Sequence, residues 1–297
     1  MRSFILTAVA ISVLPAAAQA QDFRWHGRLA LGKRVEVKGV NGDVRAIAAT
    51  GGGSEVEVTA AKHARRSDPD DVKIEVIEHD GGVTICAVYP TPRRARKENT
   101  CEVGDSWHSS TEDNDVTVDF EVRIPAGVEF GGQTVNGEMS AEGLKADVKA
   151  STVNGSVRVT TTGLAEASTV NGSVYVEMGR ADWTDELEFT TVNGTVTLVL
   201  PAQLNTEIRA STVNGDLVTD YPLTVTGRFG KHRMKGTIGS GGRSLSLSTV
   251  NGELVSDYPV TVTGRFGPRR MRGTIGSGGR SLSLSTVNGE IRLRKAT

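Results

Sequence analysis

The sequence predicts an all-β protein: a single-stranded β-helix, or β-solenoid, built on Thr-Val-Asn-Gly repeats and preceded by an N-terminal β-cap. Three observations indicate this fold. The tetrapeptide recurs along the chain, apolar and polar residues alternate with a period of two around it, and glycine reaches 35 of 297 residues, which indicates many turns. An antiparallel hairpin meander is the alternative, because Asn-Gly is also a common hairpin turn.

The Thr-Val-Asn-Gly motif occurs seven times, and a Gly-Val-Asn-Gly relative precedes the full copies. Two positions after each Asn the residue is polar, and three positions after it the residue is apolar, as in half-buried strands. Each copy therefore predicts a strand, a turn and a strand, with Asn and Gly turning the chain because both tolerate positive φ. The predicted turn residues are Asn41, Gly42, Asn136, Gly137, Asn154, Gly155, Asn171, Gly172, Asn193, Gly194, Asn214, Gly215, Asn251, Gly252, Asn288 and Gly289.

Recurring spacing favours the solenoid over the meander, because equivalent motifs would stack directly over one another. Residues 216–252 and 253–289 are tandem units that differ at only 6 of 37 positions. A solenoid tolerates the insertion of a whole unit, since each unit contacts only its neighbours. We assign residues 132–297 to the repeat solenoid, including these two units.

Residues 21–131 lack the regular motif and are predicted to form the β-cap region. Loops are expected at residues 62–71 and 90–115. The segments that alternate clearly as strands are Val35–Val37, Glu55–Thr59, Val72–Val76, Val83–Ala87 and Val116–Ile124.

Residues 1–20 have the pattern of a secretory signal peptide. Arg2 precedes an apolar stretch, and the segment ends in the small-x-small sequence Ala18-Gln19-Ala20. No later segment reaches the roughly 18 consecutive apolar residues of a membrane helix, so no transmembrane segment is expected. The chain is therefore predicted to be exported, to the periplasm or outside the cell.

Cys86 and Cys101 are the two cysteines of the chain. In an oxidising compartment such a pair normally forms a disulfide, and we expect that bond here. The bond would close a loop that contains the basic run Arg93, Arg94, Arg96 and Lys97, and loop closure of this length stabilises the fold by about 3 kcal/mol.

The sequence indicates no catalytic residues, no metal site and no cofactor. Five histidines are scattered without the spacing of metal ligands, and the Gly-x-Ser-x-Gly elbow of hydrolases is missing from the sequence. A net charge of −1 predicts no nucleic-acid partner. The histidines are His26, His63, His79, His108 and His232.

Acidic residues follow several of the turns and are the basis of an enzymatic alternative. Carboxylates on adjacent coils could act on a polysaccharide or ligate calcium. The simpler interpretation is that they are solvated residues beside turns. They are Asp43, Glu138, Asp216, Glu253 and Glu290.

Two further features suit binding. The tail units repeat a basic turn, which could hold an anionic envelope polymer or could simply protect a sheet edge. The candidate residues are Arg228, Arg233, Arg265, Arg269, Arg270 and Arg272. The Val before each Asn, from Val135 to Val287, would form either an exposed apolar stripe or, as we expect, an inward-facing row.

Several of these motifs together resemble a known family. They are the Cys-x-Val-Tyr-Pro segment from Cys86 to Pro90, the repeated Ser-Thr-Val-Asn-Gly, and the Gly- and Arg-rich tail from Gly264 to Arg280. The chain resembles the bacterial adhesin family called domain of unknown function 4097. This resemblance implies a β-solenoid in an exported envelope protein. The doubled tail unit departs from the single unit expected of the family.

These observations predict a non-catalytic exported envelope protein that serves as an adhesin-like binding or structural module. Its partner is unknown, and envelope polysaccharide or another envelope protein fits the composition. A polysaccharide-active β-helix enzyme and a partner-protein module in envelope signalling are the alternatives.

Overall fold

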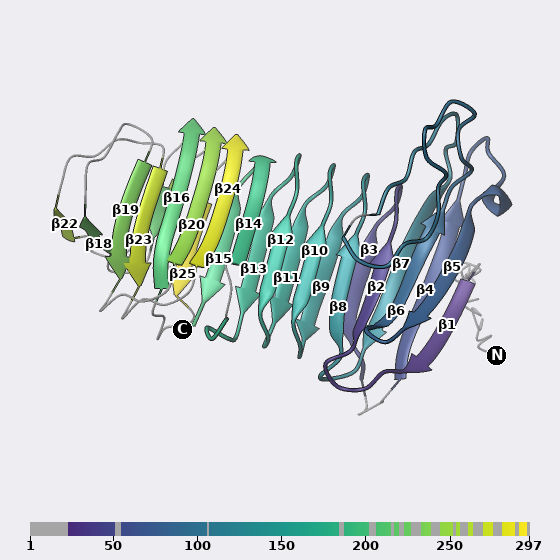
Figure 1. The fold of residues 1–297 in the computed structure, drawn as a ribbon, viewed down its shortest axis with the longest axis horizontal. Helices are drawn as coiled ribbons and strands as arrows, with labels where there is room; N and C mark the ends of the chain where they lie inside the picture. Colours follow the sequence, from purple (N-terminus) through teal and green to yellow (C-terminus); the bar gives the residue numbers. More distant parts are fainter. Residues whose placement is uncertain are drawn as a thin grey trace, which may run out of the picture.

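The computed structural model describes residues 23–50, 55–105, 107–183 and 187–201, and beyond them the backbone of the strands between Thr206 and Lys295. These residues form an elongated stack of strands in two sheets (Figure 1). The leader-like segment 1–20 lies outside the described residues.

Sheet 1 has the strand order β1-β4-β7-β3-β9-β11-β13-β15-β25-β17-β21. Its strands are β1 (Phe23–Arg28), β3 (Val44–Ala48), β4 (Glu55–His63), β7 (Thr117–Ile124), β9 (Met139–Leu144), β11 (Val157–Thr161), β13 (Val174–Met178), β15 (Val196–Leu200), β17 (Leu217–Thr219), β21 (Leu254–Val255) and β25 (Ile291–Lys295).

Sheet 2 has the order β22-β18-β19-β23-β16-β20-β24-β14-β12-β10-β8-β2-β6-β5. Its strands are β2 (Arg34–Lys38), β5 (Lys73–His79), β6 (Gly82–Val88), β8 (Glu129–Gln133), β10 (Val148–Ser151), β12 (Ala165–Ser168), β14 (Leu187–Asn193), β16 (Thr206–Asn214), β18 (Leu223–Thr226), β19 (Arg233–Ile238), β20 (Ser244–Asn251), β22 (Thr261–Thr263), β23 (Arg270–Ile275) and β24 (Ser281–Asn288). One short 3₁₀ helix, η1 (Pro69–Asp71), lies between β4 and β5.

Each coil contributes one strand to each sheet and turns between them at an Asn-Gly corner. Strands β10, β12 and β14 of sheet 2 lead through their corners into β11, β13 and β15 of sheet 1. Neighbouring coils pair in parallel, and Val157 is in register with Met139 on one side and Val174 on the other. The parallel pairing confirms the solenoid and excludes the hairpin meander for these coils.

The space between the sheets is filled by small and branched apolar side chains. Val157, Val159, Val174 and Val176 are buried from sheet 1, and small residues such as Ala150 face them from sheet 2. Because the side-chain period of a strand is two, each inward residue has an outward neighbour, which gives both sheets a polar outer face.

The N-terminal part of the chain belongs to the same stack. Strands β2 and β3 lie between β8–β9 and β6–β7, so the corner at Asn41 is stacked on the corner at Asn136. The predicted boundary between the cap and the repeats, at residues 131 and 132, falls inside strand β8 (Glu129–Gln133). Sheet 2 therefore continues across this boundary without a break. Strands were confirmed in all five of the segments predicted within residues 21–131.

Antiparallel strands close the N-terminal end of the stack. Strand β4 pairs with β7, β1 pairs with β4, and β5 pairs with β6, all antiparallel. At the other end the order of coils departs from the order of the chain. Strands β24 and β25 pair with β14 and β15, so the last motif lies beside the coil of residues 187–200.

Candidate functional site

The Asn of each corner forms a ladder along one edge of the rod. The carboxamide nitrogen of Asn136 donates to Oδ1 of Asn41 at 2.8 Å, and Asn154, Asn171 and Asn193 each donate to the preceding Asn at 2.7 Å. The backbone register extends this alignment, since Asn288 is paired in parallel with Asn193, Asn214 and Asn251. The asparagines of all eight motifs are therefore in register.

The Thr of the motif fastens each coil to its neighbour from inside. The hydroxyl of Thr152 donates to the carbonyl oxygen of Gly137 at 2.9 Å, and Thr169 donates to Gly155 at 2.8 Å. These Thr side chains are buried. A buried hydroxyl needs a partner, and here the corner glycine of the adjacent coil supplies the acceptor.

The glycine of the motif is required by close approach between coils. A Cβ on Gly155 would lie 2.0 Å from the carbonyl oxygen of Gly137, and a Cβ on Gly172 would lie 2.0 Å from that of Gly155. The turn residues Gly215, Gly252 and Gly289 lie outside the described residues.

The prediction that the corner Asn takes positive φ was wrong. Among the described residues other than glycine, only Asp113 has positive φ. The corner asparagines instead continue the parallel pairing between coils, which requires extended backbone.

The polar residue after each Asn-Gly also serves the stack. Oδ1 of Asp119 accepts from the backbone nitrogen of Asp43 at 2.9 Å, and Oδ1 of Asp43 accepts from that of Glu138 at 2.7 Å. The hydroxyl of Ser156 likewise accepts a hydrogen bond from the backbone nitrogen of Ser173 at 3.2 Å. Asp43 is therefore engaged in coil-to-coil bonding. Asp216, Glu253 and Glu290 lie outside the described residues.

The Val before each Asn forms a partly exposed row beside the Asn ladder. Val153 is 37% exposed and Val170 is 38% exposed, while Val135 and Val192 are half-buried. The expected inward-facing row was wrong for Val153 and Val170, because the inward position of the corner is taken by the Thr. Val40, in the first corner, is buried.

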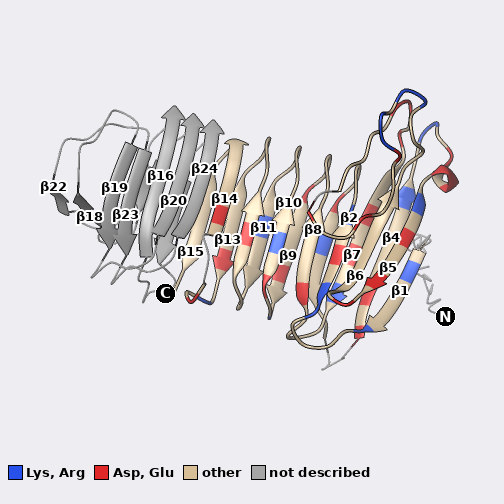
Figure 2. Cartoon of the chain, in the orientation of Figure 1, with Lys and Arg blue, Asp and Glu red and all other residues tan. Residues whose placement is uncertain are grey.

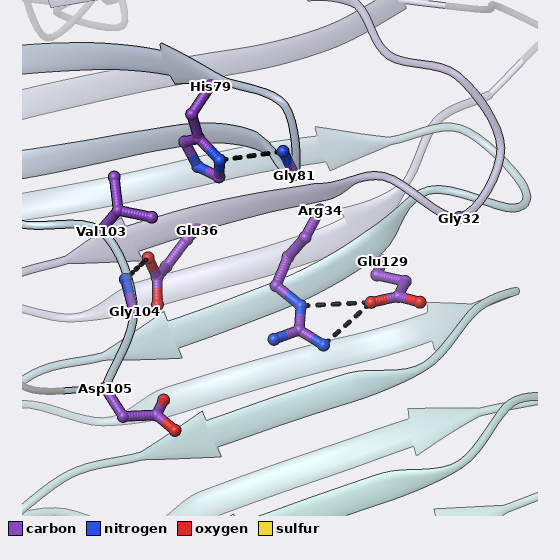
Figure 3. A pocket seen from close by; sticks show the side chains of 9 residues that line it. All are labelled: Gly32, Arg34, Glu36, His79, Gly81, Val103, Gly104, Asp105 and Glu129. Carbon is purple, nitrogen blue, oxygen red and sulfur yellow. Dashed lines mark hydrogen bonds and ion pairs between the residues drawn. The ribbon is translucent and has the colours of Figure 1, made fainter.

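A polar hollow of about 290 Å³ lies on the outer face of sheet 2 near the N-terminal end (Figure 3). Sheet residues Arg34 and Glu36 of β2 and Glu129 of β8 form its floor, and the loop segment 103–105 forms one wall. The guanidinium of Arg34 donates to Oε2 of Glu129 from both Nε and Nη2, at 3.2 and 2.9 Å.

Lys38 anchors the loop that covers this face. Its side chain points outward from β2 and is 0% exposed, because residues 101–105 lie over it. Its ammonium donates to the carbonyl oxygens of Glu102 and Gly104, both at 2.5 Å, and lies 3.3 Å from Oε2 of Glu36. The same Glu36 oxygen accepts from the hydroxyl of Thr84 at 3.0 Å.

His79 lies at the rim of the hollow. Its Nε2 lies 3.2 Å from the hydroxyl of Thr84, and its Nδ1 accepts from the backbone nitrogen of Gly81 at 3.1 Å. The described residues contain no group of three or more His, Cys, Asp or Glu side chains able to hold a metal ion. His232 lies outside them.

Two carboxylates flank Lys149 at the edge of the hollow, and their surroundings shift their pKa values in opposite directions. The hydrogen bond from Lys149, at 2.7 Å, is the main cause that lowers the pKa of Asp105. Burial is the main cause that raises the pKa of Glu166, whose Oε2 lies 3.8 Å from the same ammonium.

The disulfide between Cys86 and Cys101 is present and confirms the predicted pairing. It joins β6 to the loop that covers Lys38. A second clamp is the buried Asn99, whose Nδ2 donates to the carbonyl oxygens of Tyr89, Pro90 and Ser110 and whose Oδ1 accepts from the Ser110 nitrogen. The loop 90–115 is thus held at its base by a covalent bond and four hydrogen bonds.

Three of the six basic tail residues lie on strands whose side chains are not described. Arg233 begins β19, and Arg270 and Arg272 lie on β23, which pairs with β19 in parallel. Lys235 is in register with Arg272, so equivalent positions of the two tandem units are neighbours along the backbone. Arg228, Arg265 and Arg269 lie outside the described residues.

Sequence reasoning missed the hollow and its Lys38 anchor. Lys38 ends the alternating segment Arg34–Lys38, where it resembles an ordinary outward-facing residue. Only the loop of residues 101–105, which is 63 or more positions further along the chain, buries it. The predicted disulfide was the one available signal that this loop returns to β6.

A family model described as Toastrack DUF4097 matches residues 106–255, half of the chain. The chain belongs to the DUF4097 family. In this DUF4097 protein the matched segment begins within the loop 90–115 and continues through the coils of the Asn ladder. Most residues of the hollow, including Arg34, Glu36 and His79, precede the matched segment.

No curated protein matches this DUF4097 sequence significantly. Two solved structures match most of the length of this chain. One is a candidate cell adhesion protein from Clostridium sporogenes, with 8% identity, a TM-score of 0.40, and coverage of 92% of this chain and 99% of that chain. The other is a candidate adhesin from Bacteroides fragilis, with 9% identity, a TM-score of 0.26, and coverage of 91% and 96%. None of the described residues forms a helix long and apolar enough to cross a membrane.

Proposed function

We propose that this DUF4097 protein is an exported, non-catalytic module of the cell envelope that binds or supports an envelope component, in the manner of an adhesin. The observation that carries the proposal is the braced surface at the N-terminal end of the rod. A disulfide, a buried asparagine and a buried lysine fix one loop over an open polar face. A surface held in place in this way loses less conformational entropy when a partner binds to it.

The charges of the hollow favour binding over catalysis. Each of its three carboxylates has a cation beside it: Arg34 lies 2.9 Å from Glu129, Lys38 lies 3.3 Å from Glu36, and Lys149 lies 2.7 Å from Asp105. The hydrogen bond from Lys149 lowers the pKa of Asp105, which suits this carboxylate to hold a polar ligand and not to donate a proton at neutral pH.

Export is supported by the leader-like residues 1–20 and by the disulfide, since such bonds persist in oxidising compartments. The mass of the protein recovered from a periplasmic or culture fraction tests this point. Cleavage after Ala20 is expected. Recovery only of the uncleaved chain from the cytoplasm would overturn the proposal of export.

Binding is tested by incubating the purified mature chain with cell-wall, outer-surface and soluble envelope fractions, with and without calcium. Saturable retention by one fraction is expected. Retention by none would overturn the binding role, and release of new reducing ends from a polysaccharide would show an enzyme. Substitution of the tail residues Arg265, Arg269, Arg270 and Arg272 by Ser tests whether the tail contributes to retention.

A further inference from the structure

We propose that the tip of the disulfide-closed loop, residues 91–98, is a binding site for an anionic polysaccharide. The tip carries Arg93, Arg94, Arg96 and Lys97 within five consecutive positions, and all four side chains are exposed. Figure 2 shows this run as a blue segment on the loop that rises above the N-terminal end of the rod. The inference rests on the proposed function in one respect: the protein must be exported to reach such a polymer outside the cytoplasm.

Three of these cations are free to bind a ligand. Lys97 lies 2.7 Å from Oε1 of Glu102 and is partly neutralised by it. Arg93, Arg94 and Arg96 have no ion pair or side-chain hydrogen bond with any of the described residues. Adjacent like charges repel one another, so an anionic ligand would relieve a cost that the free loop bears.

The tip is held in place although it is exposed. Asn99 closes its neck through hydrogen bonds to Tyr89, Pro90 and Ser110, and the Asn99 backbone nitrogen donates to the hydroxyl of Thr91 at 3.0 Å. Within the tip, the nitrogen of Ala95 donates to the carbonyl oxygen of Pro92 at 2.9 Å. A pre-formed turn of this kind loses little conformational freedom when it binds.

The chemistry of the tip identifies the ligand class. Guanidinium groups bind carboxylate, sulfate and phosphate with paired hydrogen bonds. A convex turn with several charges suits a polymer with repeated anionic groups. Residues 91–98 contain no aromatic side chain on which nucleic-acid bases could stack and no large apolar side chain to enter a membrane. An anionic polysaccharide is the class that needs neither.

The test compares the mature chain with R93S/R94S/R96S. The matched control is R24S/R28S/R45S, which removes the same charge from exposed positions on β1 and β3. The probes are polygalacturonate, neutral dextran, a 12-nucleotide single-stranded DNA, and vesicles of phosphatidylcholine with phosphatidylglycerol. Affinities are measured by titration at low salt and at about 150 mM salt, where charges more than about 8 Å apart are screened.

We expect the wild-type chain to bind polygalacturonate and not dextran, with affinity falling as salt rises. The tip variant should bind at least about tenfold more weakly, a loss of about 1.4 kcal/mol, and the control should stay within about twofold. Wild-type affinity in the tip variant would overturn the site. An equal loss of affinity in the control would also overturn it, because binding would then depend only on the net charge of the protein. Tighter binding to DNA or to vesicles would overturn the ligand class.

The outcome separates this inference from the proposed function. If the wild-type chain binds an envelope fraction and the tip variant is retained equally well, the function stands and the tip site fails. If the tip binds polygalacturonate but no envelope fraction retains the chain, the site stands and the function fails. The single variant R94S, which removes one exposed side chain, should give an intermediate affinity if the arginines act together.

Discussion

The carboxamide nitrogen of Asn171 donates to Oδ1 of Asn154 at 2.7 Å, and this single contact defines the repeat of the rod. The two residues hold equivalent places in successive coils, and the same bond recurs from Asn41 to Asn193. In a ladder of this kind each interior Asn both donates and accepts. Removing one member therefore breaks two bonds.

Substitution of Asn154 by Ala is expected to destabilise the protein by about 1–3 kcal/mol, because two exposed hydrogen bonds are lost at about 0.5–1.5 kcal/mol each. The free energy of unfolding in urea measures the effect. Glu142→Ala, at an exposed position on neighbouring β9, is the control and should change stability by less than about 0.5 kcal/mol. Equal stability of N154A and the wild type would contradict the ladder's structural role.

Substitution of Gly155 by Ala should cost more than the Asn change, because its Cβ would meet the carbonyl oxygen of Gly137 at 2.0 Å. The coils would have to separate locally, and we expect a loss above about 2 kcal/mol. Gly143 is the matched control: its φ is 65°, but a Cβ added there would have no neighbouring atom within 4 Å, so G143A should cost only about 1–2 kcal/mol. A smaller loss for G155A than for G143A would refute the close-approach argument.

Substitution of Lys38 by Met is expected to release the loop that covers sheet 2. The change leaves two carbonyl oxygens and the Glu36 carboxylate without their cation, and breaking a buried pair costs about 3–5 kcal/mol. Trypsin cleavage at the exposed Arg93, Arg94 and Arg96 should become faster in the native protein. A double-mutant cycle with Glu36→Gln isolates the pair, and additive effects would show that Lys38 and Glu36 do not interact.

Asp115 makes the junction between the loop 90–115 and the connection from β4 to η1, residues 64–68, sensitive to acid. The loop predicted at residues 62–71 is therefore shorter in the structure, since β4 runs to His63 and η1 begins at Pro69. Hydrogen bonds from Ser67, followed by that from the Arg66 backbone, lower its pKa to about 2. Because the folded-state pKa lies below the unfolded value of about 3.9, the contribution is complete above pH 4 and is lost as pH falls toward 2. The urea midpoint of the wild type should therefore fall more steeply between pH 4 and pH 2 than that of D115N. Parallel curves would contradict this assignment.

Reduction of the disulfide should weaken the tip as a binding site as well as the fold. Loss of a cross-link that closes a loop of 15 residues costs about 3 kcal/mol. In C86A/C101A we expect a lower melting temperature and a lower affinity for polygalacturonate with unchanged charge. A variant that keeps the wild-type affinity would show that the Asn99 neck alone holds the tip.

The solenoid was predictable because each corner is formed by a motif of four consecutive residues that can be recognised in the sequence. The eight motifs align on Val, Asn and Gly without gaps, and the structure stacks their asparagines in that register. What the residues do at the corner was only partly foreseen. The motif predicts that Asn154 and Gly155 turn the chain, but period-two alternation does not say which side chain faces inward once the chain bends.

The hollow could not be predicted for a different reason. Arg34, Glu36 and Lys38 belong to one strand, but their partners come from residues 102–105 and 129, which are brought near by the order of coils. That order departs from chain order, and no local pattern encodes it. The disulfide was predictable because compartment and cysteine count constrain it without any knowledge of the stack.

The order of coils also sets how the rod can form. Corners from Asn136 to Asn193 join residues 17 to 22 positions apart, so those coils can add one after another along the chain. The corner at Asn41 meets Asn136 across 95 residues. Contacts this distant in sequence form slowly, because a long segment must first be brought back on itself. The N-terminal end of the rod, with its strands β2 and β3, must therefore wait for the middle of the chain. Asn193 and Asn288 are also paired across 95 residues, so both long-range closures are expected to be slow steps of folding.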